Sequence, residues 1–175
     1  MGEATRELDA ILDEVYDWVC DFVESDFFGR LGPEHQDVAE DILLTLTEYM
    51  YTYHGLLPEE WDERQIEVCC LETIPQKLAG SEEYYRAISP VVSLFLRFAG
   101  EAGFLARGAA MARRVQRLGA RICDNAMDPR FWGPTKTFAM AAVRAGVDPT
   151  DAEQMDRFLV RYKQMLAEKF KHAER

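Results

Sequence analysis

One apolar stretch constrains the fold more than any other part of the chain. It runs from Ser89 to Gly100 and reads Ser-Pro-Val-Val-Ser-Leu-Phe-Leu-Arg-Phe-Ala-Gly. A surface helix carries one apolar stripe, whereas a helix that is apolar nearly all round is buried. Ser89 suits an N-cap and Pro90 suits a first helical turn. The stretch therefore predicts a buried central helix from Pro90 to Ala99.

Two polar positions interrupt this predicted helix. Ser93 and Arg97 are four residues apart, so they share one narrow edge of a helix. An unpaired guanidinium is too costly to bury. We therefore expect Arg97 to reach solvent or an acidic partner, and Leu94, Phe95 and Phe98 to lie in the core.

The rest of the chain supplies helices that can cover the central one. Apolar residues recur at helical spacing, and Gly or Pro separates the segments, over residues 5–28, 33–53, 58–74, 106–124, 134–145 and from 150 onward. Asn125 is expected to end the fifth helix in a left-handed turn, and Thr150 to open a capping box for the last helix. No stretch favours a strand, so the fold class is all-α, a bundle of six to seven helices.

The length of 175 residues is typical of one domain. We therefore expect a single all-helical domain over residues 1–175. Gly80-Ser81 is the one plausible hinge. It leaves open an N-terminal layer of residues 1–79 packed on a bundle of residues 80–175.

Charge is distributed unevenly along the chain. Residues 1–100 carry 6 basic and 22 acidic residues, whereas residues 101–175 carry 14 and 9, for a total net charge of −11. Nucleic-acid affinity depends on a basic footprint, so we expect no nucleic-acid partner. Two like-charged rows each lie along one face of a predicted helix: Asp13, Asp17, Asp21 and Glu24, and Arg113, Arg117 and Arg121. We hypothesise that these rows face each other, within one chain or across a dimer.

The sequence also bounds the environment of the protein. No run of 18 apolar residues occurs, so no transmembrane helix and no membrane partner are expected. The N-terminus lacks the basic and apolar regions of a signal peptide. Cys20, Cys69, Cys70 and Cys123 form no Cys-x-x-Cys pair, which favours buried free thiols in a reducing cytoplasm.

Two stretches resemble a known group of proteins. Residues 61–103, with their Trp start, central Pro and Leu-Arg-Phe helix, resemble a helical module of uncharacterised prokaryotic proteins that often precedes SEC-C motifs. Phe131-Trp-Gly-Pro-Thr-Lys-Thr-Phe-Ala-Met140 looks like the C-terminal part of the same proteins. The resemblance implies a helical, cytoplasmic protein and no assigned activity. No cysteine follows Cys123, so the zinc site of the SEC-C motif has no counterpart here.

Motifs that would carry chemistry are missing from the sequence. There is no Glu-x-x-His for a di-iron site, no Gly-x-Ser-x-Gly nucleophile elbow and no P-loop. The cysteines and histidines lack the close spacing of structural zinc ligands. We therefore expect no catalytic residue, no metal and no cofactor.

Two functions remain open from the sequence. The first is a non-enzymatic interaction or structural module in the cytoplasm, which binds a protein partner or a second copy of itself. The alternative is a pocket between the fifth and sixth helices that binds or converts an anionic small molecule, using Arg113, Arg117, Arg121, Trp132 and Lys136. Convergent arginines at a concave pocket would favour the ligand, whereas a flat or paired row would favour the interaction module.

Overall fold

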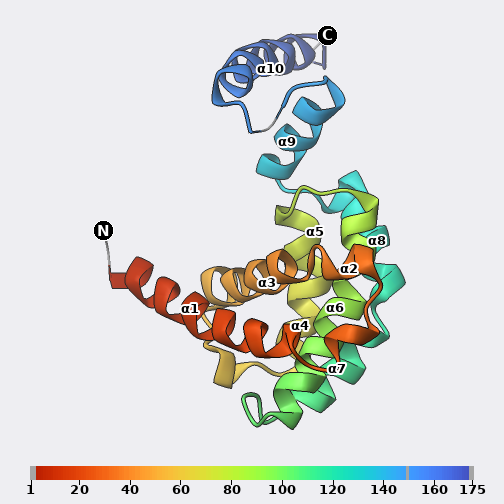
Figure 1. Ribbon diagram of the computed structural model, residues 1–175. Coiled ribbons are helices and arrows are strands. Elements are labelled where there is room, and N and C mark those ends of the chain that lie inside the picture. The colour runs from red at the N-terminus through yellow and green to blue at the C-terminus, as the bar shows by residue number, and fades with distance from the viewer. Residues whose placement is uncertain (1–2, 149, 174–175) are drawn as a thin grey trace. The chain divides into compact units, whose positions relative to one another are not determined.

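The computed structural model describes residues 3–148 and 150–173, and among them helices account for all regular structure (Figure 1). The all-α prediction is therefore confirmed. The α-helices are α1 (Glu3–Val23), α2 (Pro33–Gln36), α3 (Ala39–His54), α4 (Glu63–Val68), α5 (Ile74–Lys77), α6 (Glu82–Glu101), α7 (Gly108–Gln116), α8 (Gly119–Met127), α9 (Pro134–Arg144) and α10 (Ala152–Ala173). A π-helical segment, Cys69–Thr73, joins α4 to α5, and single 3₁₀ turns lie at Phe28–Arg30, Pro58–Glu60 and Pro129–Phe131.

The chain divides into two compact units, unit 1 (Met1–Phe131) and unit 2 (Trp132–Arg175). Residues 79 and 80 lie inside unit 1, between α5 and α6. The helices on both sides of this point contribute to one continuous core, because Ile74 and Tyr85 belong to the same buried cluster. The single-domain expectation stays a prediction.

The α6 helix is the central element of unit 1, as the sequence predicted. It packs against α1, α3, α7 and α8. Phe95 is fully buried, and its ring meets the ring of Phe22 edge-on at a centroid distance of 5.6 Å. Leu94 and Phe98, which were expected in the core, are only half-buried. They lie one turn apart on α6, at the margin of the buried face.

The predicted start of this helix is wrong. α6 begins at Glu82, and the Ser81 hydroxyl caps it by accepting a hydrogen bond from the Tyr84 amide at 3.2 Å. Pro90 lies inside the helix, where it cannot donate a backbone hydrogen bond. The buried residues on both sides of Pro90 keep the helix continuous. Ser89 is no cap; its hydroxyl donates to the Val115 carbonyl at 3.0 Å.

The predicted fifth helix is in fact two helices, α7 and α8, which meet at Arg117 and Leu118. The Val115 carbonyl at this break accepts from the Leu118 amide, at 2.9 Å, and from Ser89. At the other end of α7, a Cβ atom on Gly108 would lie only 2.3 Å from the Leu96 carbonyl oxygen. Gly108 therefore allows α7 to pack closely against α6.

Asn125 does not end a helix in a left-handed turn, because among the described residues only glycines have positive φ. It lies within α8, and its amide nitrogen donates to the Leu71 carbonyl at 2.9 Å. Pro75, four residues after Leu71, has no N–H to offer that carbonyl. Asn125 thus stabilises the π-helical segment from a neighbouring helix. His54 is the last residue of α3, and left-handed Gly55 follows it.

Unit 2 consists of α9 and α10 around a small core. Ala142, Val147 and Phe158 are buried, and Phe138, Ala141, Met155 and Tyr162 pack against them. The last helix begins one residue later than predicted. Asp151 is its cap, since its carboxylate accepts from the Gln154 amide at 3.0 Å.

Candidate functional site

The predicted arginine row lies in unit 1, on α7, on the break and on α8. Arg113, Arg117 and Arg121 are all exposed, and none has an acidic partner among the side chains described over residues 5–131. The paired arginines of α7 are different residues. Arg107 contacts Glu63 at 2.7 Å, and Arg114 pairs with Glu67, both on α4.

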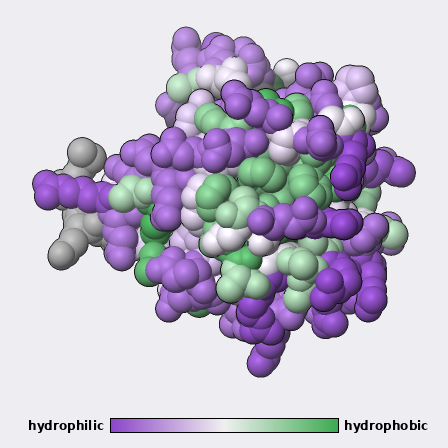
Figure 2. All heavy atoms as spheres, turned by 60° about the horizontal axis from the view of Figure 1, so that its bottom comes forward, coloured by the Kyte–Doolittle hydropathy of each residue, from purple (hydrophilic) through white to green (hydrophobic). Residues whose placement is uncertain are grey.

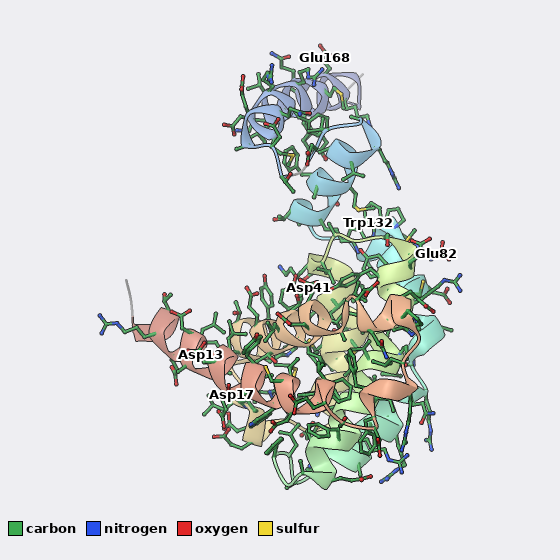
Figure 3. All side chains as sticks on the ribbon, viewed as in Figure 1. Asp13, Asp17, Asp41, Glu82, Trp132 and Glu168 are labelled. Atoms are coloured by element: carbon green, nitrogen blue, oxygen red, sulfur yellow. The ribbon has the colours of Figure 1, made fainter. Side chains whose placement is uncertain are left out.

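The acidic row of α1 does not meet the arginine row within unit 1. Asp13 and Asp17 lie on the exposed, outer side of α1 (Figure 3). The helices that pack against α1 are α3 and α6 rather than α7 or α8. The expected docking of the two rows within one chain is therefore wrong. α4 supplies the carboxylates that anchor α7.

Trp132 and Lys136, the other two predicted site residues, lie together in unit 2. The Lys136 ammonium is 5.3 Å from the centre of the Trp132 ring, and the Arg144 guanidinium is 5.4 Å from it. The Lys136 side chain is 1% exposed, and burial lowers the pKa of its ammonium to about 8. Arg144 was missed by the sequence analysis, although Lys136, Met140 and Arg144 have the four-residue spacing that places them on one helix face.

A groove of about 610 Å³ runs between α6 and α7 in unit 1. We call it the α6–α7 groove. One helical stripe from each helix lines it: Ser89, Pro90, Ser93, Leu94, Arg97 and Glu101 from α6, and Ala109, Ala112, Arg113 and Gln116 from α7. Of the five predicted site residues, Arg113 is the one that lines it. The sequence analysis missed the groove because it took this part of α6 as buried on most sides.

Most polar groups in the groove already have partners. The Ser89 hydroxyl donates to the Val115 carbonyl, and the Ser93 hydroxyl donates to the Pro90 carbonyl at 3.3 Å. Arg97 is exposed and donates to the Glu101 carboxylate at 3.4 Å, which confirms the prediction for that residue. Arg113 and Gln116 are exposed at the opposite wall.

Four half-buried aromatic residues form a second feature of unit 1, which we call the aromatic patch: Trp18, Phe27, Phe98 and Phe104. The rings of Trp18 and Phe104 stack at 5.2 Å, and Phe98 lies 6.0 Å from Phe104 and 6.2 Å from Phe27. Figure 2 brings forward the side on which the α6–α7 loop lies in Figure 1. It shows an apolar area there, ringed by hydrophilic residues.

The aromatic patch and the α6–α7 groove adjoin along α6. Phe98 in the patch lies one turn after Leu94 in the groove. Arg97, also in the groove, has its guanidinium 5.9 Å from the centre of the Phe27 ring. Val23, close in sequence to Trp18 and Phe27, is 46% exposed. The two features therefore form one continuous surface with apolar, aromatic and basic parts.

Catalytic and metal chemistry finds little support in the described residues. No three His, Cys, Asp or Glu side chains among them gather as a metal site. Burial raises the pKa of the Cys70 thiol to about 12 and also raises that of Cys69, so both thiols are poor nucleophiles. The cysteines are unpaired, as predicted, but Cys20 is exposed rather than buried.

The comparisons with known proteins assign nothing to this chain: no protein-family model, no curated protein and no solved structure matches it. Among the described helices, none combines the length and the apolar character needed to cross a membrane. The function must therefore be argued from the surface of the molecule.

Proposed function

We propose that this protein is a non-enzymatic interaction module that binds a protein partner through the aromatic patch of unit 1. The observation that carries the proposal is the stacked pair of Trp18 and Phe104, which stays partly exposed beside Phe27 and Phe98. These four rings pack against the large core of unit 1 but are not fully buried by it. A contiguous apolar area with a polar rim is typical of a protein–protein interaction site.

The residue types support the same conclusion. Trp, Phe and Arg are enriched in the few interface positions that contribute most of the binding free energy. Here Arg30 and Arg97 lie over the Phe27 ring at 4.7 and 5.9 Å. A partner that covers the rings would remove their apolar surface from water, and the arginines would remain at the rim. The proposal includes a cytoplasmic location and kinship with the prokaryotic helical modules described above.

The anionic small-molecule function stays a prediction with weaker support. Its five residues belong to two units, with Arg113, Arg117 and Arg121 in unit 1 and Trp132 and Lys136 in unit 2. Lys136 is 1% exposed, so an anion in solvent has little access to its ammonium, and burial lowers its pKa to about 8. No described feature favours this function over the aromatic patch.

The proposal can be tested by photo-crosslinking in the cells that make the protein. A photoreactive amino acid replaces Val23, beside the patch, and in a control it replaces Glu59, which is exposed elsewhere on unit 1. We expect one discrete adduct from position 23 and none of that mass from position 59. Phe104→Ser should abolish the adduct. No adduct at position 23, or equal adducts at both positions, would contradict the proposal.

A further inference from the structure

We infer that the α6–α7 groove binds an acidic amphipathic helix of the partner protein. This inference rests on the proposed function, because the groove adjoins the aromatic patch. It adds the class of segment that binds there: a helix with apolar residues on one face and Asp or Glu along the edges of that face.

The dimensions of the groove match a helix. Its α6 wall extends from Ser89 to Glu101, which is somewhat more than three helical turns. Its α7 wall extends from Ala109 to Gln116, which is about two turns. Small or apolar side chains lie along both walls, namely Pro90, Leu94, Ala109 and Ala112. Small side chains between two packed helices leave room for a third helix to lie across them.

Charge identifies which helix would fit. Arg113 lines the groove and Arg117 follows it by one turn, and neither has an acidic partner among the described side chains of unit 1. By contrast, Arg107 at the N-cap of α7 and Arg114 within α7 are paired with Glu63 and Glu67. Residues 1–131 are strongly acidic overall. Arg113 and Arg117 are therefore exposed positive charges on an acidic unit, unpaired among its described side chains, and they are complementary to acidic side chains of a partner.

The groove suits a helix better than a small anion. A small anion needs several donors that converge on one point, but the hydroxyls of Ser89 and Ser93 already donate to backbone carbonyls. Arg97, the other arginine of the groove, is already paired with Glu101, so it offers no free charge to a small anion. An amphipathic helix avoids both problems, because its apolar face covers the floor and its carboxylates reach the arginines at the wall.

The test is a selection of peptides from a phage-displayed library of random 16-residue sequences, panned on the full-length protein. We expect the enriched sequences to carry apolar residues at helical spacing with flanking Asp or Glu. Binding of a fluorescein-labelled selected peptide is then measured by anisotropy. Arg113→Glu and Arg117→Glu should each weaken binding about tenfold or more, and Arg113→Lys should retain it. Arg64→Glu, an exposed reversal on α4, is the matched control and should have no effect.

The possible outcomes separate this inference from the proposed function. If selected peptides lose binding on Phe104→Ser but keep it on Arg113→Glu, the patch binds a partner and the inference about an acidic helix is wrong. If enriched peptides lack acidic residues, the inference is also wrong. Displacement of the peptide by inorganic phosphate at low millimolar concentration would indicate a small-anion site instead. If neither Phe104→Ser nor Arg113→Glu affects peptide binding, both proposals fail.

Discussion

The two units of this chain bury different kinds of polar side chain. In the described part of unit 1, three hydroxyl residues are buried: Thr47 donates to the Leu43 carbonyl at 2.8 Å, Thr73 lies 2.9 Å from the His54 ring nitrogen, and Ser89 donates to the Val115 carbonyl at 3.0 Å. In unit 2, the buried polar side chain is a lysine, Lys136. A neutral hydroxyl with one hydrogen bond is inexpensive to bury, whereas an ammonium is costly. The free energy of unfolding should therefore respond to different changes in the two units.

The size of the core explains this difference. Unit 1 assembles residues from α1, α3, α6, α7 and α8 into one cluster, and the buried hydroxyls of Thr47, Thr73 and Ser89 have partners within the unit. Unit 2 has two helices and three buried apolar residues. Small domains bury a smaller fraction of their surface. We expect unit 2 to be marginally stable and sensitive to pH, and unit 1 to be stable and sensitive to core truncation.

The largest expected effect comes from truncation of the two cores. Phe95→Ala should lower the free energy of unfolding of unit 1 by about 3–5 kcal/mol, the usual cost for a buried aromatic residue. Phe158→Ala should leave that transition unchanged and remove the separate transition of unit 2. Urea titration followed by circular dichroism measures both. A loss under about 1 kcal/mol for Phe95→Ala would show that α6 is not the organising helix.

The second prediction concerns pH. The pKa of Lys136 is about 8 in the folded protein and about 10.5 when the chain unfolds, so the unfolded state binds more protons between these values. The stability of unit 2 should therefore rise from pH 8 toward pH 10, by at most about 3 kcal/mol. Lys136→Met should remove this rise.

Unit 1 should show the opposite pH dependence. Burial raises the pKa of Cys70 and of Tyr49 to about 12, so the unfolded chain loses these protons first as the pH rises above about 9. The stability of unit 1 should therefore fall above pH 9. Thermal melts of the wild-type protein at a series of pH values test both signs. Parallel slopes for the two transitions would contradict the comparison.

The third prediction concerns the polar link inside unit 1. Asn125→Leu leaves the Leu71 carbonyl without its side-chain donor, and should cost about 1–3 kcal/mol. Gln76→Leu, an exposed amide on α5, is a matched control and should cost less than about 0.5 kcal/mol. Chemical denaturation of both variants gives the comparison. Equal losses would show that Asn125 does not stabilise the π-helical segment.

The smallest expected effect separates the two sets of arginines. Arg114→Glu breaks the pair with Glu67 and should lower the stability of unit 1 by up to about 1 kcal/mol. Arg113→Glu breaks no ion pair in unit 1 and should leave stability nearly unchanged. Differential scanning calorimetry in low salt can resolve the difference. A larger loss for Arg113→Glu would mean that this arginine has a structural role.

Periodicity and composition were enough to predict the helical fold and the central position of α6. Propensity rules failed where tertiary contacts compete with local signals. Ser89 and Pro90 are residue types that often start a helix. Here α6 continues through them, because the residues before and after them are buried in the core. Asn125 is a residue type that often ends a helix. In the structure its side-chain amide instead donates a hydrogen bond to a carbonyl 54 positions away in sequence. No local pattern contains that information.

The candidate site was predictable only in part. Four-residue spacing identified the row of Arg113, Arg117 and Arg121, and the structure shows that all three are exposed. Trp132 and Lys136 were assigned to one pocket with these arginines, but the structure brings only those two together. The aromatic patch combines residues from α1, from the segment after it, from α6 and from the α6–α7 loop. Such a surface depends on how distant segments pack. The sequence analysis assigned Phe98 to the core because it could not tell a buried face from its exposed margin.

The central claim is that a protein partner binds at the aromatic patch, and the three tryptophans test it directly because each reports on a different part of the molecule. Trp18 lies in the aromatic patch, Trp61 is buried in the core of unit 1, and Trp132 lies in unit 2. The protein is labelled with 5-fluorotryptophan, and each ¹⁹F resonance is assigned with a Trp→Phe variant. The partner recovered by crosslinking is then titrated in. We predict that the Trp18 resonance shifts and broadens while those of Trp61 and Trp132 do not move. A shift of Trp132 with Trp18 unchanged would contradict the account and place binding in unit 2.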